Sequence, residues 1–102
     1  MNTLTRSSEN IQKLIKKYMM FFEPFERVYL FGSSVDKTFQ DDIDILLLYN
    51  VYSNEICNVT PLIRHILQKE LQITVDITIL SIFEEKEVGF LERLKDRFIR
   101  LK

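Results

Sequence analysis

Residues 28–49 read VYLFGSSVDKTFQDDIDILLLY, and this stretch determines how the rest of the chain is interpreted. Its apolar residues predict two strands, 27–31 and 42–49, joined by a polar segment whose serines can cap one helical turn. The apolar run from Ile45 onward indicates a central strand that is buried on both faces. Glycine occurs only twice in the chain. Gly32 stands where the first strand ends, which indicates a positive φ or a close approach of the backbone there.

Two helices are predicted on either side of this stretch. The first runs from residues 7–8 to Pro24, because six apolar residues recur at helical spacing. These residues are Ile11, Leu14, Ile15, Tyr18, Met19 and Phe22. The second helix is predicted within 53–71, where Pro61 behind Thr60 resembles a first-turn proline behind an N-cap. The residues before Thr60 would then form a loop or a separate turn.

The second half of the chain predicts a further strand and a further helix. Residues 72–80 alternate between apolar and polar, which is typical of a strand. Ser81 and Glu84 have the spacing of a capping box, so a helix is predicted to begin there. This helix carries Phe83, Val88, Leu91 and Leu94. Residues 98–102 either continue the helix or form a short closing strand, and we favour the strand.

The predicted elements form a single α+β (mixed α/β) domain over residues 1–102, with a small mixed sheet of three to four strands flanked by helices. The net charge of −1 creates no overall field that would attract nucleic acid or an anionic membrane. The basic residues near the C-terminus are interleaved with Glu92 and Asp96, which favours a solvated surface. These basic residues are Arg93, Lys95, Arg97, Arg100 and Lys102.

Cysteine content and hydropathy bear on the cellular location. Cys57 is the only cysteine, so the chain cannot form an internal disulfide, which fits a reducing compartment. No apolar run approaches the roughly 18 residues that span a membrane. We therefore expect a cytoplasmic protein with no membrane partner, and nucleic acid is not an expected partner either.

Three aspartates lie in or at the start of the predicted strands, although aspartate is disfavoured in strands. Asp42 and Asp44 are two residues apart, so they project to one face at a Cα spacing of roughly 6.5 Å. If Asp76 lies at matching height on an adjacent strand, three carboxylates converge. Two negative charges about 5 Å apart repel by about 3 kcal/mol at an effective dielectric of about 20, so such a cluster holds a proton or binds a cation. Oxygen ligands alone indicate Mg²⁺ or Mn²⁺.

A simpler alternative is that Asp41 and Asp42 are turn residues and Asp44 is a solvated edge residue. The Gly32-Ser33 turn favours the site instead, because backbone N–H groups in such a turn can bind an anion. A phosphate-binding turn beside metal-binding carboxylates is typical of sites that catalyse metal-assisted phosphoryl or nucleotidyl transfer.

The segments LFGSS, DDIDILL and VDITIL together resemble the minimal nucleotidyltransferase (MNT) family of the polymerase-beta superfamily. The resemblance implies the nucleotidyltransferase fold and a nucleotidyl transfer reaction with ATP as substrate. It implies that Gly32 and Ser33 contact the triphosphate of the nucleotide, with Ser34 in the same nucleotide-binding turn.

The resemblance also assigns a role to each of the three carboxylates. Asp42 and Asp44 would ligate two Mg²⁺ ions. Asp76 would ligate one of these ions and help to deprotonate the acceptor hydroxyl. All three are therefore expected to be both catalytic and metal-binding residues.

Small MNT proteins pair as antitoxins with HEPN-type ribonuclease toxins, and some silence the toxin by adding AMP to a tyrosine. The resemblance therefore implies a protein adenylyltransferase (AMPylation enzyme) that acts as an antitoxin, in a homo- or hetero-oligomer. The chain lacks the arginine after Gly-Ser and the second glycine that many members have, and its connector before Asp42 is shorter. These departures support an alternative, in which the protein neutralises its partner by binding alone. Lys37 is a candidate for the missing positive charge, although an ordinary surface lysine fits the sequence equally well.

Overall fold

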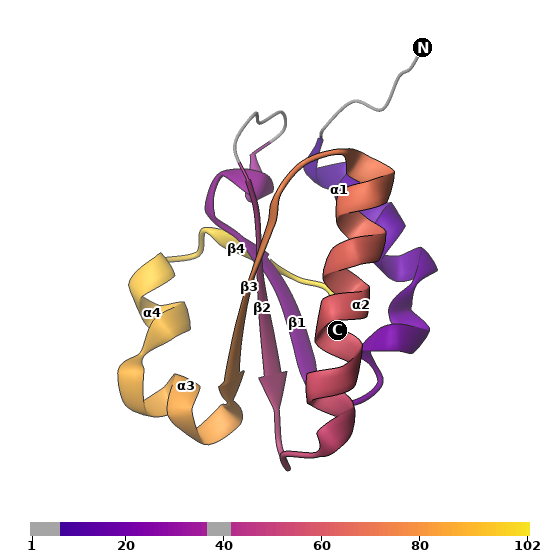
Figure 1. Cartoon of the computed structure of the whole chain (residues 1–102). Helices are drawn as coiled ribbons and strands as arrows, with labels where there is room; N and C mark the ends of the chain where they lie inside the picture. The colour runs from indigo at the N-terminus through magenta and orange to yellow at the C-terminus, as the bar shows by residue number, and fades with distance from the viewer. Residues whose placement is uncertain (1–6, 37–41) are drawn as a thin grey trace.

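Figure 1 shows the computed structural model of the chain, which describes residues 7–36 and 42–102. The strands form one four-stranded sheet in the order β3-β2-β1-β4. They are β1 (Arg27–Phe31), β2 (Ile43–Tyr49), β3 (Val75–Ser81) and β4 (Phe98–Arg100). β1 is antiparallel to both β2 and β4, whereas β2 and β3 are parallel. The predicted mixed sheet and its closing C-terminal strand are therefore confirmed.

Helices cover both faces of the sheet. They are α1 (Ser8–Lys17), η1 (Met19–Phe22), η2 (Gly32–Val35), α2 (Asn54–Leu71), α3 (Ile82–Val88) and α4 (Phe90–Leu94), where η denotes a 3₁₀ helix. α1 and α2 lie on one face, and α3 and α4 lie on the other (Figure 1). None of the helices in the described part of the chain is both long and apolar enough to cross a membrane.

Strand β2 contributes buried residues to both faces, as the sequence predicted for a central strand. Ile43, Ile45 and Leu47 are fully buried in the larger cluster under α1 and α2. Leu46 and Leu48 are fully buried in the smaller cluster under α3 and α4. The sheet therefore has a large core on one side and a small one on the other.

The first helix ends earlier than predicted. α1 begins at Ser8 behind its N-cap Ser7, whose side chain accepts a hydrogen bond from the Asn10 N–H, but it ends at Lys17. The Tyr18 N–H then bonds two carbonyl groups at once, and the chain tightens into the 3₁₀ helix η1. The apolar stripe continues across this change, because Phe22 is fully buried beside the helix.

The prediction for Pro61 is wrong, because α2 runs without interruption from Asn54 and contains the proline in its interior. Thr60 is not an N-cap: it is buried, and its Oγ1 donates to the Ile56 carbonyl 2.7 Å away. An interior proline removes one backbone hydrogen bond and costs about 3 kcal/mol in an isolated helix. Burial of the apolar face of α2 against the sheet offsets that cost, which a local motif cannot anticipate.

Two local predictions around β3 need adjustment. The strand begins at Val75 rather than residue 72, because Gln72 adopts a left-handed conformation that ends α2. The capping box at Ser81 is confirmed: its Oγ accepts from the Glu84 N–H at 2.9 Å, and Oε1 of Glu84 accepts from the Ser81 N–H at 2.8 Å. The single helix expected after it is two helices, because Gly89 adopts φ +64° between α3 and α4.

Candidate functional site

Two of the predicted aspartates lie side by side at one end of the sheet, where β1 ends and both β2 and β3 begin (the upper end in Figure 1). Asp44 is the register partner of Phe31 on β1 and of Asp76 on β3. Partners on adjacent strands project to the same face, and the strands are about 4.8 Å apart. Asp44 is half-buried and Asp76 is exposed. The sheet therefore presents two neighbouring carboxylates on the face that carries α3 and α4.

Gly32 combines the two features that the sequence suggested for it. Its φ is +69°, a conformation that residues with a side chain rarely adopt. A Cβ atom at this position would lie 3.2 Å from Cγ of Asp44 and would overlap the Oδ2 of that carboxylate. The turn after β1 and the aspartate of β2 are therefore in direct contact, and only glycine leaves room for the carboxylate.

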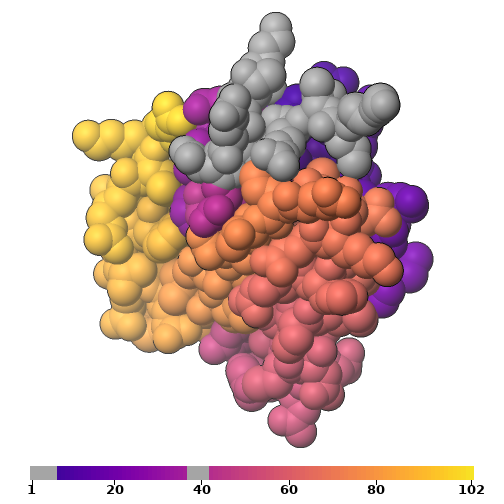
Figure 2. All heavy atoms as spheres, turned by 45° about the horizontal axis from the view of Figure 1, so that its top comes forward, coloured from indigo at the N-terminus to yellow at the C-terminus, as the bar shows by residue number. Residues whose placement is uncertain are grey.

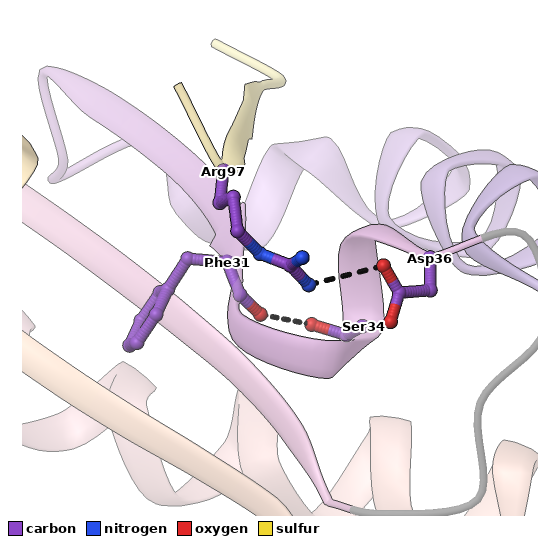
Figure 3. Close-up of polar contacts among 4 residues, drawn as sticks. All are labelled: Phe31, Ser34, Asp36 and Arg97. Atoms are coloured by element: carbon purple, nitrogen blue, oxygen red, sulfur yellow. Dashed lines mark hydrogen bonds and ion pairs between the residues drawn. The ribbon is translucent and has the colours of Figure 1, made fainter. Parts of the chain in front are cut away.

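Ser34 connects the same turn to both strands. Its hydroxyl donates to the Phe31 carbonyl, as Figure 3 shows, and accepts a 3.4 Å hydrogen bond from the Asp44 N–H. The residue is fully buried. Its side chain therefore fixes η2 against β1 and β2, and a direct contact between Ser34 and nucleotide stays a prediction. Ser33 is only half-buried, and its carbonyl accepts from the Asp36 N–H at 3.0 Å.

An ion pair joins the end of η2 to the segment before β4. Nη2 of Arg97 lies 3.0 Å from Oδ1 of Asp36, and the two side chains are 60% and 49% exposed (Figure 3). From the sequence alone, Arg97 belongs to a predicted solvated basic surface. A contact between residues 61 positions apart has no signature in local spacing, so only the fold could reveal it.

Asp42 is exposed and stands immediately before β2. Within residues 7–36 and 42–102, no group of three or more His, Cys, Asp or Glu side chains is arranged to hold a metal ion. The fold thus pairs Asp44 with Asp76, and the participation of Asp42 in a three-carboxylate site stays a prediction. Lys37 and Asp41 lie outside the described residues.

The chemistry of the paired carboxylates fits a hard divalent cation. Two such charges about 5 Å apart repel by about 3 kcal/mol at an effective dielectric of about 20, and by less where water reaches them, as it does at Asp76. A cation between the carboxylates would remove this repulsion. Because the donors are carboxylate oxygens, Mg²⁺ is a better match than a soft metal.

A separate cavity of about 470 Å³ lies at the other end of the sheet, where Tyr49 ends β2. Tyr52 and Cys57 line it, and the phenol of Tyr52 contacts the Cys57 thiol. The hydrogen bond to Cys57 raises the pKa of Tyr52 above its ordinary value of 10.0. None of the predicted site residues lines this cavity.

The arrangement of the strands and the paired carboxylates agrees with a family-level comparison. The model of the family described as "Polymerase beta, Nucleotidyltransferase" matches residues 9–94. The chain belongs to the polymerase beta nucleotidyltransferase family. The matched segment includes Gly32, Asp44 and Asp76, so the turn and both carboxylates lie within the nucleotidyltransferase domain.

A solved structure supports the same fold. The crystal structure of a mutant of the toxin–antitoxin pair MntA-HpeT contains a chain similar to this one, with a TM-score of 0.51 and 17% sequence identity. The similarity covers 94% of this chain and 73% of that chain. The expected nucleotidyltransferase fold is therefore confirmed. No curated protein sequence matches the chain.

Proposed function

We propose that this protein is a Mg²⁺-dependent nucleotidyltransferase that transfers AMP from ATP to a protein. The observation that carries the proposal is the register pair Asp44–Asp76, which lies beside a glycine turn in contact with Asp44. The turn and the carboxylates are thus one unit. Membership of the polymerase beta nucleotidyltransferase family supports the same reaction class.

In the proposed reaction, an acceptor hydroxyl attacks the α-phosphorus of ATP. A bond forms between the hydroxyl oxygen and the α-phosphorus, and the bond from that phosphorus to the bridging oxygen of pyrophosphate breaks. Asp76 receives the hydroxyl proton, which suits a solvent-exposed carboxylate next to the open edge of the sheet. Gly32 and Ser33 hold the triphosphate, and Ser34 keeps their turn fixed against the strands.

Asp42, Asp44 and Asp76 are the residues that would hold Mg²⁺. When bound, the ions stabilise the charge that develops on the phosphoryl oxygens. Asp44 is the central residue of the three, because it contacts the glycine turn on one side and pairs with Asp76 on the other.

We further propose that the acceptor is a HEPN-type toxin and that this protein is its antitoxin. The support is the fold similarity to a chain from a toxin–antitoxin pair. In this role the protein forms a hetero-oligomer with the toxin and inactivates it by AMPylation of a toxin hydroxyl.

The test is transfer of radioactive label from α-³²P-ATP to a purified toxin encoded by a neighbouring gene. We expect label on the toxin with Mg²⁺ and none with excess chelator. The double variant Asp42→Asn/Asp44→Asn should lose the label. Glu87→Gln is a matched control, because it makes the same acid-to-amide change at an exposed position of α3, and it should label normally. Unchanged labelling by the double variant would refute the proposed site.

A second candidate function is neutralisation of the toxin by contact alone. The observation that favours it is a groove of about 340 Å³ between η1 and α2, where Met20 and Leu62 are 73% and 42% exposed. Exposed apolar residues around a groove are typical of protein interaction surfaces. In this case the Asp42→Asn/Asp44→Asn variant would still protect cells from the toxin, whereas Met20→Asp would not.

A further inference from the structure

Arg97 occupies a position that the strand register places next to the glycine turn. β4 pairs with β1 through Phe98 and Phe31, which are the first residue of β4 and the last residue of β1. Arg97 and Gly32 are each one residue beyond this pair, and they follow it in the same direction along the sheet. Arg97 and Gly32 therefore directly flank the last residue pair between β4 and β1.

The backbone that leads to Arg97 is strained. Lys95 and Asp96 have φ values of +49° and +68°, and neither is a glycine. Two consecutive left-handed residues are unfavourable and persist only where the surrounding structure enforces them, which is often at functional sites. The Arg97 N–H then bonds to the Leu94 carbonyl at 3.0 Å. This sharp turn directs the chain from α4 back towards η2.

The guanidinium of Arg97 lies at η2 itself. Its partner Asp36 is the C-cap of η2, and the Asp36 N–H bonds to the Ser33 carbonyl. Figure 2 shows this end of the molecule, where the magenta atoms around η2 meet the yellow atoms of the C-terminal segment. One turn of 3₁₀ helix thus separates the guanidinium from the residues that hold the triphosphate in the proposed function.

A triphosphate at this turn needs a positive charge from the protein. Among the described residues, the candidate site otherwise contributes Asp42, Asp44 and Asp76, whose negative charges oppose an anionic ligand. Arginine is well suited to the task, because its planar group donates two parallel hydrogen bonds to phosphate oxygens.

We propose that Arg97 is the phosphate-binding residue of this site and that Asp36 holds its guanidinium beside the turn until the nucleotide arrives. This inference rests on the proposed function. The ion pair is exposed on both sides, and exposed pairs contribute little to stability, so phosphate oxygens can replace the Asp36 carboxylate. Arg97 is thereby a second component of the triphosphate site, supplied by the far end of the chain.

The experiment measures binding of Mg²⁺-ATP and of inorganic tripolyphosphate by calorimetry, which requires neither the toxin nor turnover. We expect Arg97→Ala to raise the Kd for both ligands by about tenfold. Asp36→Asn should leave both values unchanged or lower them, because it removes the competing carboxylate. Lys86→Ala controls for the loss of one positive charge. Lys86 is exposed on α3, which follows the C-terminal end of β3, whereas the candidate site lies where β3 begins. The Lys86→Ala variant should therefore bind both ligands like the wild type.

The outcomes separate the possible roles of Arg97. If Arg97→Ala and Asp36→Asn weaken binding equally, the pair is only a structural connection and the proposal is overturned. It is also overturned if Arg97→Ala binds like the wild type, or if Lys37→Ala alone weakens binding. A wild-type protein that binds neither ligand would overturn the proposed function as well. Equal thermal unfolding of the Arg97→Ala and Asp36→Asn variants would show that a difference in binding is not a difference in folding.

Discussion

The two faces of β2 differ, because one packs entirely into the core and the other begins with a residue of the candidate site. On the face under α1 and α2, Ile43, Ile45 and Leu47 are all fully buried. On the other face the strand begins with half-buried Asp44, and only then do Leu46 and Leu48 meet α3 and α4. Stability is therefore concentrated on one face, which leaves the first residue of the other face available for a charged group. The following substitutions test this division through the free energy of unfolding.

The largest loss should come from Ile45→Ala on the core face. Removing a fully buried isoleucine side chain leaves a cavity and costs about 2–5 kcal/mol. Urea unfolding followed by circular dichroism measures this loss. A cost below about 1 kcal/mol would mean that the larger cluster does not dominate the stability of the fold.

Gly32→Ala should cost about 2 kcal/mol, because the positive φ is unfavourable for alanine and the new Cβ displaces the Asp44 carboxylate. Gly89→Ala is the matched control: its φ is +64°, but a Cβ there would meet nothing closer than 3.9 Å. The Gly89→Ala variant should therefore lose only the stability that an alanine at positive φ costs, about 1 kcal/mol. Nucleotide binding should weaken in the Gly32→Ala variant but not in the Gly89→Ala variant. Equal losses of stability and binding in both variants would refute the contact between turn and carboxylate.

Ser81→Ala should cost about 1 kcal/mol, because it removes the side chain that caps α3. This loss should be confined to the face of the sheet with the smaller core, because α3 and α4 cover that face. Amide hydrogen exchange should increase in α3 while α2 stays protected. Global unfolding with uniform exchange would contradict the view that the two faces differ in stability.

Asp76→Asn should have the smallest effect and the opposite sign. Neutralising one of two neighbouring carboxylates relieves repulsion and should raise the free energy of unfolding by about 1 kcal/mol or less in the absence of Mg²⁺. The gain should shrink in 1 M NaCl, where charges at the surface are screened. A loss of stability would show that Asp76 makes a favourable contact within the fold.

The sequence predicted the strands and the capping box well because these patterns are local. Alternation places Val75, Ile77 and Ile79 on one face whatever the rest of the chain does. The helix interiors were predicted less well, since the position of Pro61 within α2 depends on packing that outweighs its local cost. Gly32 was identified from its position alone, whereas the contact that requires it involves Asp44 on another strand. Arg97 could not be found from sequence, because its neighbour Asp36 is set by the pairing of β4 with β1.

Asp76 has a further consequence, because β3 forms one edge of the sheet. An edge strand leaves backbone groups unpaired and can recruit a strand from another molecule, and a charged side chain on that strand discourages such pairing. Asp76 is exposed at the start of an otherwise uncharged β3, VDITILS. A carboxylate that we propose for the site is therefore also expected to discourage edge-to-edge pairing between molecules. Variants that neutralise it to silence the site should be more stable as monomers yet less soluble at high concentration.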